Sequence, residues 1–159
     1  MDKESVHGYT ARISQASRSE LVVILYEMTL SEITEVRKAY QAGDFTSFDK
    51  ELKKAQKFVS ELTAVLDYRY SVSYDLLSLY LYVSKRIITA IMRKNPVSLD
   101  SAESVLIKLL EGFSGVSAAD TSGPMMRNSQ QLYAGLTYGK GKLNETYLDP
   151  DNRSRGFIA

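Results

Sequence analysis

Residues 48–66, FDKELKKAQKFVSELTAVL, carry the clearest structural signal in the chain, because apolar side chains recur there at steps of four and three. Six side chains with this spacing share one stripe of a helix, which the two-residue period of a strand does not allow. The stripe consists of Phe48, Leu52, Ala55, Val59, Leu62 and Leu66. The stretch therefore predicts an amphipathic helix over about residues 45–69.

Apolar stripes on either side predict three more helices, over about residues 18–41, 73–94 and 98–113. Local signals agree with these limits: Ser17 and Glu20 form a capping box, Gly43 ends the first of these helices, and Asn95-Pro96 stops the third. Short connections make successive helices antiparallel neighbours. We predict an all-α fold, an antiparallel up-down four-helix bundle with a short N-terminal segment packed on it and a flexible C-terminal tail.

Glycine and proline divide the chain into a regular body and an irregular end. From Tyr9 to Glu111 the chain contains only Gly43 and Pro96 of these two types, whereas they crowd the sequence from Gly112 onward. We expect a cap segment over residues 1–16, a bundle domain over 17–116 and a tail over 117–159. The apolar residues of that tail leave two interpretations open, a flexible extension or a linear motif that docks on this bundle or on another protein.

Composition excludes several classes of function. The 159 residues include 20 Lys and Arg against 19 Asp and Glu, and a net charge of +1 gives no bulk attraction to nucleic acid or an anionic membrane. No run of about 18 apolar residues is present, so we expect no membrane insertion. The N-terminus lacks the basic-then-apolar pattern of a signal peptide, which predicts a cytoplasmic protein.

The same composition argues against an enzyme. The chain has no cysteine, and its one histidine, His7, lies ahead of the first of the four predicted helices, away from the positions where a bundle builds dimetal sites. The glycine-rich stretch at residues 135–141 is one residue short of a phosphate-binding loop and has no Ser or Thr after its lysine. We expect no catalytic residue, no metal and no cofactor.

The predicted third bundle helix is more apolar than a bundle requires. In residues 76–83, LLSLYLYV, seven of eight positions are apolar or aromatic, whereas a bundle helix needs about three in seven. One interpretation is a central helix covered by its neighbours; the other is a groove that binds a partner polypeptide in helical form. Upstream, Tyr9 and Ile13 lie four residues apart and could pack on the bundle, although a frayed end is an alternative.

Residues 15–30, QASRSELVVILYEMTL, resemble the signature of the FliS family of flagellin secretion chaperones. Tyr9 stands where that family carries an N-terminal tyrosine. Further likeness covers roughly residues 7–116. It includes Ala55-Gln56, Glu61-Leu62, Leu66-Asp67, Leu76, Leu79-Tyr80, Arg86-Ile87 and Asn95-Pro96.

The resemblance implies a cytoplasmic chaperone that binds the disordered C-terminal region of flagellin, prevents premature filament assembly and presents the subunit to a component of the flagellar type III export gate. It also implies that the N-terminal segment, with Tyr9 and Ile13, covers part of the groove when flagellin is absent. As groove residues we expect Leu25, Tyr26, Met28, Leu76, Leu77, Tyr80 and Leu81. The competing function is a structural adaptor that forms a homo-oligomer through the same surface, and a weak homodimer stays open.

Overall fold

The computed structural model describes residues 3–125, with side chains from Gly8 onward. The chain separates into two units, Met1–Arg127 and Asn128–Ala159, and every described residue lies in the first. The described part is entirely helical and contains no strand, which confirms the predicted all-α class. Its elements are α1 (Lys3–Gln15), α2 (Arg18–Gln41), α3 (Phe45–Ala64), α4 (Val72–Arg93), the 3₁₀ helix η1 (Pro96–Ser98) and α5 (Leu99–Ala119).

The predicted helix limits hold at most ends. The Ser17 side chain caps α2 by accepting a hydrogen bond from the backbone N–H of Glu20 (3.2 Å). Gly43 follows α2 with a φ of +71°, the left-handed conformation that glycine adopts without steric cost. Asp44 then caps α3 by accepting from the N–H of Ser47 (3.0 Å). The α2–α3 connection is therefore set by its own residues.

Two predicted limits are wrong. The sequence predicts that the second helix reaches residue 69, but α3 ends at Ala64; the Asp67 side chain accepts from the backbone N–H of Arg69 and forms a local turn in place of the last predicted helical turn. The fourth was expected to end near residue 113, but α5 continues through Gly112 and Gly115 to Ala119. Glycine in a helix interior costs only about 1 kcal/mol, which packing of the helix can offset.

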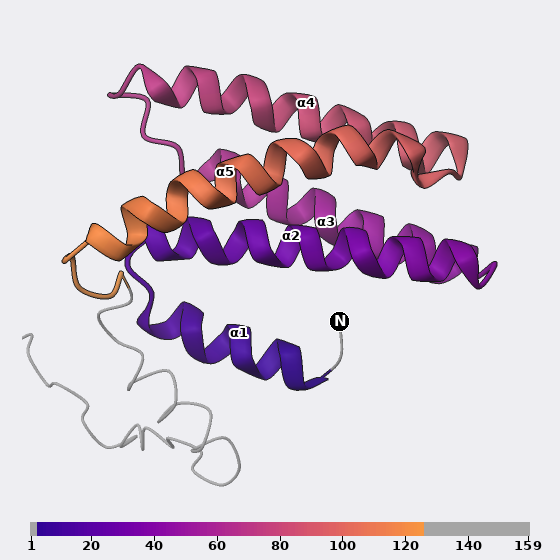
Figure 1. Ribbon diagram of the computed structural model, residues 1–159, viewed down its shortest axis with the longest axis horizontal. Coiled ribbons are helices and arrows are strands. Elements are labelled where there is room, and N and C mark those ends of the chain that lie inside the picture. The colour runs from indigo at the N-terminus through magenta and orange to yellow at the C-terminus, as the bar shows by residue number, and fades with distance from the viewer. Residues whose placement is uncertain (1–2, 126–159) are drawn as a thin grey trace, which may run out of the picture. The chain divides into compact units, whose positions relative to one another are not determined.

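The four long helices enclose one apolar core. Contacts join α2 to α3 and to α5, α3 to α4, and α4 to α5, an arrangement compatible with a four-helix bundle (Figure 1). All four helices contribute side chains with no more than 1% of their surface exposed. Among them are Tyr26, Ile33, Val36, Phe48, Leu52, Leu62, Tyr80, Val83, Ile87, Leu99 and Leu106.

The N-terminal segment forms a helix, α1, that packs against α2. In Figure 1, α1 lies below α2 and α4 lies above it. Val23 and Ile24 of α2 are buried (7% and 0% exposed) without being part of the core that the four long helices share. The Arg12 guanidinium on α1 pairs with Glu27 of α2 (2.6 Å), three residues beyond Ile24. We conclude that α1 covers a second apolar face of α2.

Within residues 3–125, none of the helices combines the length and the apolar character that crossing a bilayer requires.

Candidate functional site

A cavity of about 420 Å³ opens where α3 ends and α4 begins, and we call it the end pocket. Apolar side chains from four helices and the α3–α4 turn form most of its lining, and polar side chains stand around them. The apolar residues are Val22, Leu62, Val65, Leu66, Val72, Leu76, Tyr80 and Phe113; the charged ones are Arg18, Asp67 and Asp120. Such a lining can hold an apolar side chain of a bound peptide, while the polar groups around it contact the peptide backbone or a neighbouring polar side chain.

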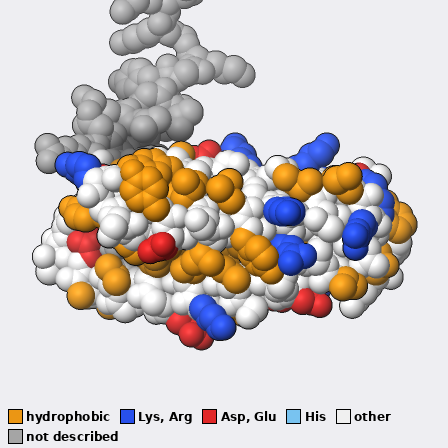
Figure 2. All heavy atoms as spheres, turned by 90° about the horizontal axis from the view of Figure 1, so that it is seen from above, with side chains coloured by type: hydrophobic (Ala, Val, Ile, Leu, Met, Phe, Trp, Pro, Cys, Tyr) orange, Lys and Arg blue, Asp and Glu red, His pale blue; other side chains and the backbone are white. Residues whose placement is uncertain are grey.

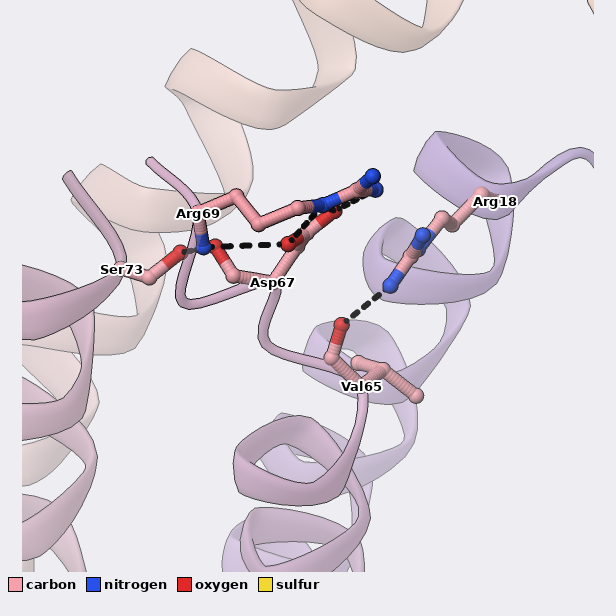
Figure 3. Close-up of polar contacts among 5 residues, drawn as sticks. All are labelled: Arg18, Val65, Asp67, Arg69 and Ser73. Atoms are coloured by element: carbon pink, nitrogen blue, oxygen red, sulfur yellow. Dashed lines mark hydrogen bonds and ion pairs between the residues drawn. The ribbon is translucent and has the colours of Figure 1, made fainter. Parts of the chain in front are cut away.

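Hydrogen bonds hold the α3–α4 turn in place at the edge of this pocket (Figure 3). The Arg18 guanidinium of α2 donates to the carbonyl of Val65 (3.0 Å). The Ser73 hydroxyl of α4 donates to the carbonyl of Asp67 (2.6 Å), and Arg69 pairs with the Asp67 carboxylate (2.5 Å). The hydrogen bonds from Arg69 lower the pKa of Asp67 to about 2, so this carboxylate stays ionised at neutral pH. These contacts fix the turn to α2 and to the start of α4.

On its other side the pocket is bounded by the segment that follows α5. The Ser19 hydroxyl of α2 donates to the Asp120 carboxylate, which also accepts from the backbone N–H of Ser122 (2.9 Å). Hydrogen bonds from Ser122 and Ser19 hold the pKa of Asp120 well below its usual range. Further on, the N–H of Met125 donates to the carbonyl of Ala16 (3.0 Å). The end of α5 is therefore joined to the start of α2.

Two buried tyrosines meet beneath the pocket. The hydroxyl groups of Tyr26 and Tyr80 are 2.5 Å apart and hydrogen-bonded, and the ring of Phe113 meets that of Tyr26 edge to face at 5.6 Å. Burial and this hydrogen bond raise the pKa of Tyr26 above its ordinary value, and burial raises that of Tyr80, so both stay neutral. The pair satisfies two polar groups that burial would otherwise leave without partners.

A second apolar surface runs along the outside of α4. Five side chains recur at steps of three, four, seven and four residues, which places them on one face of the helix, and we call them the α4 stripe. Leu81, Ile88 and Met92 are 59%, 42% and 79% exposed. Figure 2 views the molecule from the side on which α4 lies in Figure 1, and several groups of hydrophobic side chains are exposed on that face. The stripe consists of Tyr74, Leu77, Leu81, Ile88 and Met92.

The predicted groove residues fall into four groups. Leu25, Tyr26 and Tyr80 are buried in the core, although Tyr80 also reaches the lining of the end pocket. Leu76 lines the pocket, and Leu77 and Leu81 belong to the α4 stripe. Met28 is half-buried on α2, and the predicted cap residues Tyr9 and Ile13 are half-buried on α1. The structure brings Leu76 and Tyr80 together in one cavity.

Several residues of these surfaces were not among the sequence predictions. The end pocket includes Val65, Val72 and Phe113, which come from a turn, a helix start and the far end of α5. No spacing pattern connects such positions, since only the fold brings them together. Ile88 and Met92 could have been found, because they continue the helical spacing of Leu77 and Leu81 beyond the run at residues 76–83.

The end pocket and the α4 stripe are suited to burying apolar side chains of a partner. Among the residues that the structure describes, no group of three or more His, Asp or Glu side chains is placed to hold a metal ion. Helical proteins that expose a pocket and an apolar helix face of this kind are typical binders of other polypeptides.

A model of the family described as flagellar protein FliS matches residues 2–120, so the chain belongs to the FliS family. No curated protein sequence matches the chain significantly. Membership implies a general role as a flagellar export chaperone, and the family is one of chaperones rather than enzymes.

Proposed function

We propose that this chaperone binds the disordered C-terminal region of flagellin on the α4 stripe and in the end pocket, and so prevents premature polymerisation in the cytoplasm. It then delivers the subunit to a component of the flagellar type III export apparatus. One observation carries the proposal: α4 supplies apolar side chains both to the core and to its outer face, where Leu81 is 59% exposed. A bundle gains nothing for its own stability from that outer face.

The two surfaces are continuous along one helix. Leu76 lines the end pocket, and Leu77, the next residue, belongs to the α4 stripe, which ends at Met92. Fifteen residues of helix between Leu77 and Met92 span about 22 Å, the length of a client helix of about four turns. Burial of apolar side chains on both partners would offset the several kcal/mol that ordering a disordered segment costs.

We infer that an antiparallel up-down four-helix bundle presents these surfaces, with residues 1–16 as a cap; because α5 ends at Ala119, the bundle extends to residue 119 rather than 116 and the tail begins at residue 120. Part of that tail, residues 126–159, lies outside the described residues. The ring of contacts among α2, α3, α4 and α5 supports the bundle. The half-buried state of Tyr9 and Ile13 and the burial of Ile24 support a cap that rests on α2.

Since α1 packs on α2 and not on the α4 stripe, we propose that flagellin also binds the apolar face of α2 with Val23 and Ile24, where the cap would compete with it. Its displacement would lower the apparent affinity and so ease release at the export apparatus. Deleting residues 1–16 should then preserve or tighten flagellin binding, measured by calorimetry. A severe loss of affinity would show that the segment contacts the client directly.

Substitutions on α4 test the proposed groove. Leu81→Asp places a charge on the exposed stripe and should leave the protein folded while it weakens binding of a C-terminal flagellin peptide by about tenfold or more. Leu77→Asp, at a half-buried position, distinguishes core from groove: unfolding means core, and a folded protein without binding means groove. Ile107→Asp is the matched control, because Ile107 is 42% exposed on α5, outside the stripe. Equal binding by all three variants would disprove the proposed site.

Sizing of the purified chain separates this function from a structural adaptor. A monomer at all concentrations that forms a 1:1 complex with the flagellin peptide supports the chaperone. A stable dimer that ignores the peptide supports an adaptor that forms a homo-oligomer through the same stripe. A weak dimer that the peptide dissociates also supports the chaperone, since client and second copy then compete for one surface.

A further inference from the structure

A second cavity, of about 680 Å³, lies at the opposite end of α4 and has a different character. Its walls come from the last two turns of α4, from η1 and from the first turn of α5. Thirteen residues separate Leu76 in the end pocket from Thr89 in this cavity, which corresponds to about 20 Å along the helix. The two cavities are therefore separate sites, and we call the second one the arginine cavity.

Two arginines give this cavity its charge. Arg86 and Arg93 both line it, and among the described residues neither guanidinium pairs with a carboxylate. The one acidic side chain in the lining, Asp100, lies 2.7 Å from the guanidinium of Arg37, which also pairs with Glu103 (2.7 Å). Asp100 and Glu103 share the guanidinium of Arg37, so the three arginines and two carboxylates around the cavity leave a net charge of +1, and Arg86 and Arg93 keep no carboxylate partner of their own.

The neighbouring polar groups are engaged elsewhere, so the guanidinium groups are the main donors available to a ligand. The Ser98 hydroxyl donates to the carbonyl of Arg86 (2.9 Å), and the Thr89 hydroxyl donates to that of Lys85 (2.8 Å). The guanidinium of Arg86 lies over the ring of Tyr82, 4.8 Å from its centroid. That contact orients the arginine while it leaves donors free.

The spacing of the arginines favours a peptide over a single small anion. Seven residues apart on α4, they are separated by about 10 Å along the helix axis. Two carboxylates match that distance when they lie seven residues apart on a helix or three apart on an extended chain. Val97, 70% exposed in the same lining, offers an apolar contact between charged groups.

We propose that the arginine cavity binds an acidic segment of a partner polypeptide, with one carboxylate on Arg86, a second on Arg93 and an apolar side chain against Val97. Arginine binds carboxylates in a bidentate manner, which gives such a contact direction as well as charge. The proposal does not depend on flagellin binding at α4, since the two sites share no residue.

The test uses the full chain and a helical peptide with glutamates seven residues apart and leucines between them. Calorimetry measures the affinity of the peptide, and amide chemical shifts locate where it binds. We expect shifts at residues 86–101 and an affinity that falls as salt is raised. The double variant Arg86→Gln with Arg93→Gln should weaken binding by about tenfold or more. Lys85→Gln, which removes an exposed charge on α4 outside the lining, should bind as the unmodified chain does.

Three results would overturn the proposal: equal binding of a peptide with glutamine in place of glutamate, equal binding by the double variant, or displacement of the peptide by inorganic phosphate at similar concentration. The last would indicate a small-anion site instead. The flagellin peptide serves as an independent check on folding, because the double variant should bind it with unchanged affinity if it binds the unmodified chain at all. If the unmodified chain does not bind the flagellin peptide, circular dichroism shows whether the double variant is folded.

Discussion

At the residue scale, the hydroxyl groups of Tyr26 and Tyr80 form a side-chain hydrogen bond enclosed in the core. Both side chains are no more than 1% exposed, so removal of one hydroxyl leaves the other without its hydrogen-bond partner. Tyr80→Phe should therefore lower the free energy of unfolding by about 1–2 kcal/mol in urea denaturation. Tyr26→Phe should act similarly.

The double variant shows whether the two hydroxyl groups act together. Since each single change leaves the other hydroxyl unsatisfied, the loss in the double variant should be smaller than the sum of the single losses. Tyr74→Phe is the control, because Tyr74 is 58% exposed and its change should have little effect. Strictly additive losses would mean that the contact contributes nothing specific.

A buried pair of carboxyl groups, Glu32 of α2 and Glu51 of α3, sets a pH dependence. Glu32 is 1% exposed, and one of its oxygens lies 3.8 Å from the ammonium of Lys54. Burial first, and then the hydrogen bond with Glu51, raises the pKa of Glu32 from 4.5 to about 7. Protonated Glu32 is therefore the favoured form in the folded chain below neutral pH.

The raised pKa of Glu32 determines how the free energy of unfolding changes with pH. Between pH 4.5 and about 7 the folded chain binds more protons at Glu32 than the unfolded chain does, so this contribution to stability falls as pH rises through that window. Glu32→Gln keeps a donor for Glu51 without a charge. Urea denaturation at pH 5 and pH 8 should show that the free energy of unfolding falls less with pH in Glu32→Gln than in the unmodified chain. At pH 8 the variant should be more stable than the unmodified chain by about 1–3 kcal/mol.

The exposed Glu61 on α3 provides the comparison for this experiment. In Glu61→Gln the free energy of unfolding should decline between pH 5 and pH 8 by the same amount as in the unmodified chain. If Glu32→Gln instead destabilised the protein at pH 8, the ion pair with Lys54 would outweigh the cost of burying the charge.

At the element scale, α5 runs through two glycines that it does not require. A Cβ atom built at Gly112 or at Gly115 would have no heavy atom within 4 Å outside its own helix turn. Gly112→Ala and Gly115→Ala should therefore each raise the free energy of unfolding by about 0.5–1 kcal/mol, because alanine restricts the unfolded chain.

Gly43 gives the opposite result and serves as the control. A Cβ there also has open space, but its φ of +71° is a left-handed conformation that costs alanine about 1–2 kcal/mol. Gly43→Ala should therefore lower the melting temperature, whereas the two α5 variants raise it. A stabilised Gly43→Ala would show that the α2–α3 turn rearranges freely.

The same glycines explain what sequence could and could not predict about the elements. Spacing and caps predicted α2 and α4 within a residue or two of their limits, because Ser17, Gly43 and Asn95 act locally. Counting glycines failed at α5, which continues past Phe113 to Ala119 and is joined to α2 just beyond its end by the hydrogen bond of Ser19 with Asp120. The surplus of apolar residues on α4 was visible, but its division between core, pocket and stripe depends on which face each neighbour covers.

At the scale of the whole described unit, α1 is the element with the weakest attachment. Its contacts are with α2, and the Arg12–Glu27 ion pair, with side chains 43% and 29% exposed, is worth less than about 1 kcal/mol. The four long helices, in contrast, share one core. Opening of α1 should therefore be a local event that leaves α2 to α5 intact.

Hydrogen exchange measures that difference directly. Amide protons of α1 that exchange slowly enough to follow should report an opening free energy below about 2 kcal/mol, whereas amides near Ile33, Val83 and Leu106 should report the full free energy of unfolding. Arg12→Gln should speed exchange in α1 and leave those core amides unchanged. Equal protection in α1 and in the core would mean that α1 unfolds only with the whole unit. A cap that could be lifted from α2 while the bundle stays folded would then be excluded, and with it the competition between cap and client.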